Sequence, residues 1–216
     1  MEAFSAARAA VRNRVSIDAT LLTNIRSDYC NWVIPGRVMC GPYPGHDDVN
    51  FHNRQDAAAN IAAITGDGID TFVCLQDEEP HGRNRRPRYA TLLNASQNGQ
   101  VTTYSYHHFP VVDDKVPDHR SFVQHMTVLL ELLARGKNIY IHCAGGHGRT
   151  GTYVACLLMT LFDYPVKHAL YYTQYLHNLR RKNDARCRGT IPCMSPENDV
   201  QIEFVHQYAH FLKFAS

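Results

Sequence analysis

The sequence predicts an α/β fold in which a central, mostly parallel, twisted sheet is flanked by helices. Short β-branched and apolar runs alternate along the chain with longer segments of helical character, an order typical of strand–helix units. The chain has 216 residues, and 44% of them are hydrophobic, which is enough for one sizeable core. We therefore expect a single domain over residues 1–216, with residues 1–28 as an amino-terminal helical extension.

The expected elements follow one another without internal repeats, low-complexity tracts or a linker. The expected strands are residues 31–38 (a turn leading into a strand), 70–75, 101–109 and 138–141. The expected helices are residues 57–64, 118–135, 152–162, 166–182 and 196–214. Asp118 is placed to cap its helix, because an aspartate side chain accepts hydrogen bonds from the free N–H groups of a first turn. Strands that alternate with helices in this way favour parallel pairing.

Charge and cysteine content narrow the class of protein. The formal net charge is +2, which is too balanced for a dedicated nucleic-acid binder. The seven cysteines are scattered and form no C-x-x-C pair, and no apolar run is long enough to cross a membrane. We expect a reducing compartment, the cytoplasm or alternatively the nucleus, and no integral membrane segment.

The most informative segment is residues 141–151, Ile-His-Cys-Ala-Gly-Gly-His-Gly-Arg-Thr-Gly. It lies between an expected strand and an expected helix, where free backbone N–H groups and the positive end of the helix dipole favour an anion. Its glycines allow successive N–H groups to converge on one point and form a nest for a phosphate-sized group. The sequence therefore predicts an anion site here.

Three side chains give this anion site a chemistry. Cys143, at the base of the nest, is expected to be a thiolate nucleophile, because helix N-termini and nearby cations stabilise thiolates. Arg149 can offer two parallel N–H groups to two phosphoryl oxygens. Thr150 brings a hydroxyl close to the sulfur. Together they predict phosphoryl transfer through a phosphocysteine, with no metal and no cofactor.

The motif His142-Cys143-x5-Arg149-Thr150 resembles the signature loop of the cysteine-dependent protein tyrosine phosphatase superfamily, and most of all its compact dual-specificity branch. The resemblance implies a dual-specificity phosphatase-like fold, with Cys143 as nucleophile, Arg149 as phosphate clamp and Thr150 as the assisting hydroxyl. It also implies that the substrate phosphate is bound by the amides of Ala144, Gly145, Gly146, His147, Gly148 and Arg149.

A second segment resembles the acid loop of small dual-specificity enzymes. Residues 109–117 read Phe-Pro-Val-Val-Asp-Asp-Lys-Val-Pro, about thirty residues before the nucleophile. The resemblance favours Asp114 as the general acid, since it stands three residues before the second proline. Asp113 is the alternative acid, and otherwise it would cap the turn or orient the loop.

The same resemblance gives roles to Cys74 and Gln201, which lie outside the two loops. Cys74 is placed where some relatives carry a cysteine that forms a reversible disulfide with the oxidised nucleophile. Gln201 is a candidate for positioning the hydrolytic water. The ring of His147 is expected to face the substrate, and His142 to hold loop backbone atoms. Two basic clusters could line the mouth of the pocket or be solvated loops: Arg83, Arg85, Arg86 and Arg88, and Arg180, Arg181, Lys182, Arg186 and Arg188.

The predicted function is a metal-independent phosphatase that acts on phosphotyrosine and phosphoserine or phosphothreonine in proteins. A phosphoinositide phosphatase, an RNA 5′-phosphatase and an inactive phosphate-binding module remain alternatives, because the same loop serves each of them. No metal is expected, since His142 and His147 beside the nucleophile lack the spacing that closed zinc sites prefer.

Overall fold

The computed structural model describes residues 1–12, 14–15, 30–44, 54–77, 93, 104–180 and 193–215. The strands are β1 (Asn31–Ile34), β2 (Val38–Gly41), β3 (Thr71–Gln76), β4 (Ser105–Val111) and β5 (Ile139–His142). The helices are α1 (Glu2–Arg12), α2 (Arg54–Gly66), α4 (His119–Ala134), α5 (Gly148–Phe162), α6 (Val166–Asn178) and α7 (Asp199–Phe214).

The five strands form one sheet in the order β1-β2-β5-β3-β4. β1 pairs antiparallel with β2, and the other three pairings are parallel. This confirms the predicted α/β fold with a mostly parallel sheet. β5 lies at the centre, and its last residue, His142, is paired with Gly41 of β2 and Cys74 of β3. The carboxyl ends of the parallel strands therefore meet where Cys143 begins the loop.

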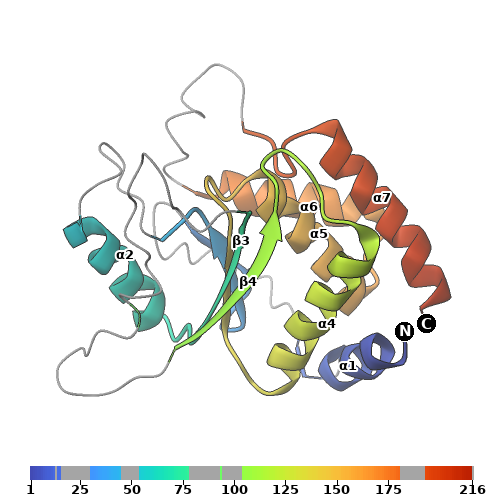
Figure 1. Cartoon of the computed structure of the whole chain (residues 1–216), viewed down its shortest axis with the longest axis horizontal. Helices are drawn as coiled ribbons and strands as arrows, with labels where there is room; N and C mark the ends of the chain where they lie inside the picture. The colour runs from blue at the N-terminus through green and yellow to red at the C-terminus, as the bar shows by residue number, and fades with distance from the viewer. Residues whose placement is uncertain are drawn as a thin grey trace.

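Helices cover both faces of the sheet. α1 and α4 to α7 lie on one side and α2 lies on the other (Figure 1). Along β5, Ile139 and Ile141 belong to the larger apolar cluster, and Tyr140 belongs to the smaller one beneath α2. Successive side chains of a strand point to opposite faces, so this central strand contributes to both cores.

The amino-terminal helix α1 is part of the packed body. Phe4 and Val11 are fully buried in the larger cluster, which also holds residues of α4 and α5. Arg8 donates to the carbonyl of Thr160 at 2.9 Å and pairs with Asp163 at 2.7 Å, so α1 is held against the carboxyl end of α5.

Most predicted elements are present with boundaries shifted by a few residues, but residues 31–38, predicted as a turn leading into one strand, hold β1, a turn and the start of an unpredicted strand, β2. The Asp118 cap is confirmed, since its carboxylate accepts a 3.0 Å hydrogen bond from the backbone N–H of Ser121. α5 starts at Gly148, four residues before the predicted start, so the last four residues of the signature segment are already helical. Residues 101–103 and 181–192 lie outside the described residues.

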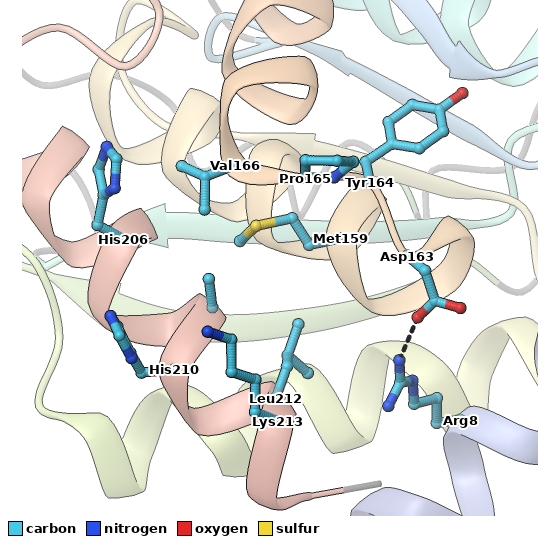
Figure 2. Close-up of a pocket in the computed structure, with 11 residues that line it drawn as sticks. Arg8, Met159, Asp163, Tyr164, Pro165, Val166, His206, His210, Leu212 and Lys213 are labelled. Carbon is cyan, nitrogen blue, oxygen red and sulfur yellow. Dashed lines mark hydrogen bonds and ion pairs between the residues drawn. The ribbon is translucent and has the colours of Figure 1, made fainter.

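A cavity of about 390 Å³ opens at the far end of α5 from the loop (Figure 2). Its lining combines the apolar Met159 and Val166 with His206, His210 and Lys213 of α7.

Within the described part of the chain, no group of three or more metal-ligating side chains comes together. Among those same residues, no helix has the length and apolar character needed to span a membrane.

Candidate active site

The segment between β5 and α5 forms a tight loop around the sulfur of Cys143. This side chain is buried, with 3% of its surface exposed. The backbone N–H of Gly146 donates to the Cys143 Sγ at 3.3 Å, so at least one loop amide already points at the predicted nucleophile. The free N–H groups of the first turn of α5 follow directly.

Gly146 is the position where the loop requires a glycine. Its φ of 73° lies in the left-handed region, and a Cβ there would lie 2.3 Å from the backbone carbon of Gly41. The neighbouring carbonyl of Ala144 accepts a 2.9 Å hydrogen bond from the N–H of Tyr43. The loop is therefore packed against the end of β2, which fixes its curvature.

Arg149 connects the loop to two other strand ends. Its guanidinium, 4% exposed, donates from Nη1 to the carbonyl of Val111 at 3.0 Å. Its Nη2 lies 2.6 Å from Oδ1 of Asp113, and its Nη1 lies 3.8 Å from Oδ1 of Asp77. The predicted phosphate clamp, the predicted acid segment and the carboxyl end of β3 thus meet at one guanidinium.

The two neighbouring aspartates of the acid segment have different surroundings. Asp113 presents its carboxylate to Arg149. Asp114 has a left-handed backbone, with φ of 59°, and its carbonyl accepts from Nδ2 of Asn198 at 3.1 Å. Asn198 caps α7, so the acid segment is attached to the start of that helix. Of the two side chains, the structure shows the Asp113 carboxylate in contact with Arg149, and which aspartate is the general acid remains a prediction.

Thr150 and Gln201 are the other two residues with a predicted role in catalysis, and both roles remain predictions. The Oγ1 of Thr150 is buried and makes no hydrogen bond to any residue that the structure describes, so this hydroxyl remains available to a neighbouring sulfur. The side-chain amide of Gln201 lies so close to Gly148 that a Cβ there would be 2.7 Å from its Nε2. Gln201 is itself oriented by the N–H of Glu197, which donates to its Oε1 at 2.9 Å.

His147 corrects a sequence-based expectation. Its ring is 4% exposed, and Nδ1 shares a 2.6 Å hydrogen bond with Nε2 of His177 on α6. The ring therefore packs into the protein, and the expectation that it faces the substrate is wrong. Only the backbone of His147 is left to contact a phosphate bound in the loop.

Two buried histidines beside the loop are held neutral. Burial lowers the pKa of His142 and of His177 to about 3, from an ordinary value near 6.5. His142 Nδ1 lies 3.1 Å from the carbonyl of Cys143, which confirms the expectation that this ring contacts loop backbone. Protonation of either ring therefore opposes the folded state.

These pKa values predict that the protein loses stability in mild acid. Since both folded pKa values are depressed, the unfolded chain binds more protons below pH 6.5, and stability falls as pH drops from 6.5 toward 3. Each histidine contributes about 1.4 kcal/mol per pH unit in that window. Urea unfolding at pH 7.5, 6.0 and 5.0 measures the slope. His177→Gln should make the slope shallower, because one of the two depressed groups is removed, and His168→Gln, which replaces an exposed ring on the same helix, is the control for the substitution itself.

Two further cysteines lie on the strands on either side of β5, which ends one residue before Cys143. Cys74 on β3 pairs with His142, and Cys40 on β2 pairs with Ile141, so each is one strand away from the loop. Both thiols are free, and burial raises the pKa of each. Cys74 thus lies where the redox role requires it, and that role remains a prediction.

Mild peroxide treatment tests the redox role of Cys74. Peroxide oxidises the Cys143 thiolate to a sulfenic acid, which the Cys74 thiol then attacks, forming a disulfide and releasing water. Mass spectrometry is expected to find the Cys74–Cys143 crosslinked peptide in the wild type and in Cys40→Ser, but not in Cys74→Ser. A Cys143 oxidised to the sulfinic acid beside a free Cys74 contradicts the role.

The two basic clusters and Cys193 bear on the remaining predictions. The first basic cluster and most of the second lie outside the described residues, but Arg180 is buried behind the loop and does not line the pocket mouth. Cys193 is disulfide-bonded, which does not fit the reducing compartment expected from the cysteine pattern.

Four residues of the site were not identified from the sequence as parts of it. Asp77 reaches Arg149, and its position directly after a buried strand beside β5 is a signal that could have revealed it. Ser195 donates from Oγ to the carbonyl of His147 at 3.0 Å. His177 and Asn31 act through contacts with residues 30 or more positions away, for which the sequence carries no local signal.

Comparison with family models matches residues 27–205 to the model described as PTP-SAK, Swiss Army Knife protein, DSP-PTPase phosphatase domain. Cyclin-dependent kinase inhibitor 3 of Rattus norvegicus is 30% identical over 188 residues, which cover 84% of this chain and 81% of the rat protein. Protein 067L of Invertebrate iridescent virus 3, provisionally named a tyrosine phosphatase, is 32% identical over 104 residues. The match covers 46% of this chain and only 42% of the viral protein.

Solved structures share the fold. Kinase associated phosphatase, crystallised with its catalytic-site cysteine replaced by serine, matches with a TM-score of 0.61 and 22% identity. The match covers 82% of this chain and 87% of that one. The arrangement of sheet and helices is therefore shared with a phosphatase of known structure.

Proposed function

This chain belongs to the DSP-PTPase phosphatase family, and from that premise we propose that it hydrolyses phosphate monoesters through a phosphocysteine formed on Cys143. One observation carries the assignment of residues. The buried guanidinium of Arg149 follows the Cys143 loop directly and holds the carboxylate of Asp113 at 2.6 Å. The proposed anion clamp and the proposed acid are therefore in contact beside the loop that carries the proposed nucleophile.

The first step is attack of the Cys143 thiolate on phosphorus. Loop amides, of which the Gly146 N–H already points at the sulfur, and the two terminal nitrogens of Arg149 stabilise the negative charge on the equatorial oxygens. The aspartate protonates the leaving oxygen as the P–O bond breaks, so that an alcohol leaves rather than an alkoxide.

The second step hydrolyses the phosphocysteine. Water attacks phosphorus, the same aspartate takes its proton, and the thiolate leaves. The free hydroxyl of Thr150 donates to the departing sulfur, and the Gln201 amide beside Gly148 orients the water. Both roles are those that the family resemblance implies.

We assign the acid to Asp113, with Asp114 as the alternative. The Asp113 carboxylate reaches the guanidinium that would hold the phosphate, so a small rotation brings it to the leaving oxygen. With substrate bound, the phosphate replaces the carboxylate on Arg149. The carbonyl contact between Asp114 and Asn198 then fixes the segment that carries the acid.

We propose phosphorylated proteins, through phosphotyrosine and phosphoserine or phosphothreonine, as the substrate class. Phosphoinositides and RNA 5′-phosphates are the alternatives. Ala144, Gly145 and Gly146 bring no cation to the loop, and the ring of His147 is occupied by His177. The loop thus offers no second basic side chain to a multiply phosphorylated headgroup, which supports protein substrates. We also propose a reducing compartment, the cytoplasm or the nucleus, because the free thiol of Cys143 must stay reduced to act, although the Cys193 disulfide opposes this placement.

Turnover and trapping together test the proposed function. Hydrolysis of p-nitrophenyl phosphate in EDTA is expected, and acid quenching during turnover should leave a phosphoryl group on the Cys143 peptide. Turnover that EDTA abolishes, or a phosphoryl group on another residue, contradicts the mechanism. A panel of phosphotyrosine and phosphothreonine peptides, an inositol lipid and a 5′-phosphorylated RNA then identifies the substrate class.

A further inference from the structure

Arg180 is a buried cation placed directly behind the anion loop. It follows the end of α6 and is 6% exposed. We propose that Arg180 is a positioning residue for the phosphatase reaction, which fixes the direction of the loop amides through the Gly146 carbonyl and adds a buried positive charge behind the bound anion. The inference rests on the proposed function in taking Cys143 as the reactive thiol.

The guanidinium of Arg180 bonds to three separate parts of the chain. Its Nη1 donates to the carbonyl of Gly146 at 3.0 Å, and its Nε donates to Oδ1 of Asn31 at 2.7 Å. Its Nη2 lies 3.4 Å from the sulfur of Cys40. The loop is thus tied to the first residue of β1 and to β2 through one rigid, planar group.

The contact with Gly146 determines which backbone groups face the anion. The Gly146 N–H points at the sulfur of Cys143, and the Gly146 carbonyl points at Arg180. In a trans peptide the carbonyl and the following N–H point in opposite directions, so the N–H of His147 is directed away from Arg180. A flip of this peptide would turn a carbonyl dipole toward the phosphate, which opposes anion binding. Arg180 holds the peptide against that flip.

The charge of Arg180 has no acidic partner among the described residues. Its three partners are a backbone carbonyl, an amide oxygen and the Cys40 thiol. Burial raises the pKa of that thiol, so it is neutral near pH 7. A buried cation is stabilised by a nearby negative charge, and since no described carboxylate contacts Arg180, we infer that the anion of the loop, either the Cys143 thiolate or the bound phosphate, supplies it.

The experiment compares Arg180→Met and Arg180→Lys with Arg37→Met as the matched control. Arg37 also donates to backbone carbonyls, those of Gly136 and Leu133, but at the amino-terminal end of β5, away from the loop. Two quantities report on the loop in full-length protein: the pH midpoint of Cys143 alkylation by iodoacetamide, and the inhibition constant of inorganic phosphate. The kcat for p-nitrophenyl phosphate is measured beside them. Melting temperatures report folding.

Arg180→Met is expected to raise the alkylation midpoint by about half a pH unit and to weaken phosphate inhibition by about 10-fold. Arg180→Lys should restore the midpoint, because the charge returns. It should not restore kcat, because one ammonium group cannot bond to Gly146, Asn31 and Cys40 together. Arg37→Met should lower the melting temperature and leave both quantities unchanged.

A folded Arg180→Met variant with the wild-type midpoint and phosphate affinity overturns the inference. If that variant does not fold, the kcat of Arg180→Lys tests the inference instead. A wild-type kcat in Arg180→Lys overturns it. These results leave the proposed function intact, since the wild type still turns over. A wild-type protein without turnover and without phosphate protection of Cys143 removes the proposed function and this inference together.

Discussion

Cys143→Ser is expected to lower kcat by at least about 10⁴-fold, because a serine hydroxyl in this loop is not ionised near neutral pH and the thiolate is the attacking group. Binding of phosphate should persist. The cradle is made of backbone N–H groups and Arg149, and the substitution changes neither. Steady-state hydrolysis of p-nitrophenyl phosphate gives the loss in rate, and vanadate or phosphate titration gives the retained binding.

Cys74→Ser is the matched control for this experiment. Cys74 is also buried, and it lies within β3, where it pairs with His142, the residue before Cys143. Its replacement should keep kcat within a few-fold of wild type. Turnover retained in Cys143→Ser together with loss in Cys74→Ser contradicts the assignment of the nucleophile.

Asp113→Asn is expected to lower kcat by about 10² to 10⁴-fold, the range for removal of a general acid. The loss should be larger for a phosphoserine peptide than for p-nitrophenyl phosphate, because an alkoxide needs the proton more than a nitrophenolate does. The high-pH limb of the kcat profile should also disappear, since that limb reports ionisation of the acid. Inorganic phosphate should bind more tightly, because no carboxylate then competes for Arg149.

Two neighbouring substitutions are the controls for Asp113→Asn. Asp114→Asn should cost little, since its contact with Asn198 uses the backbone carbonyl. Asp118→Asn removes a charge next to that segment yet keeps a side chain that caps α4 well, so it controls for electrostatic changes near the loop. A larger loss of kcat in Asp114→Asn than in Asp113→Asn would assign the role of general acid to Asp114.

The parts of the site that the sequence predicted are contiguous in the chain. Cys143, Arg149 and Thr150 fall within one strand–loop–helix unit, whose local pattern determines the position of the nest and of the helix N-terminus. The sheet was predictable for a similar reason, because alternating strands and helices leave few arrangements. Asp118 was recognised as a cap because the cap contacts only the next turn.

The parts that the sequence did not predict depend on contacts between distant segments. The choice between Asp113 and Asp114 depends on the left-handed backbone at residue 114 and on its contact with Asn198, 84 positions away. The orientation of the His147 ring is set by His177, 30 positions away. A pattern of residue types carries no information about such pairs, because they form only once α6 and α7 have packed.

The central position of β5 has a consequence for how rigid the nucleophile is. The strand has parallel neighbours on both sides and side chains in both apolar clusters, so it opens only when most of the molecule unfolds. Its amide protons should therefore exchange with deuterium at rates close to those of global unfolding. An inhibitor that fills the anion nest then binds a site that is already formed, so it should associate in a single kinetic phase.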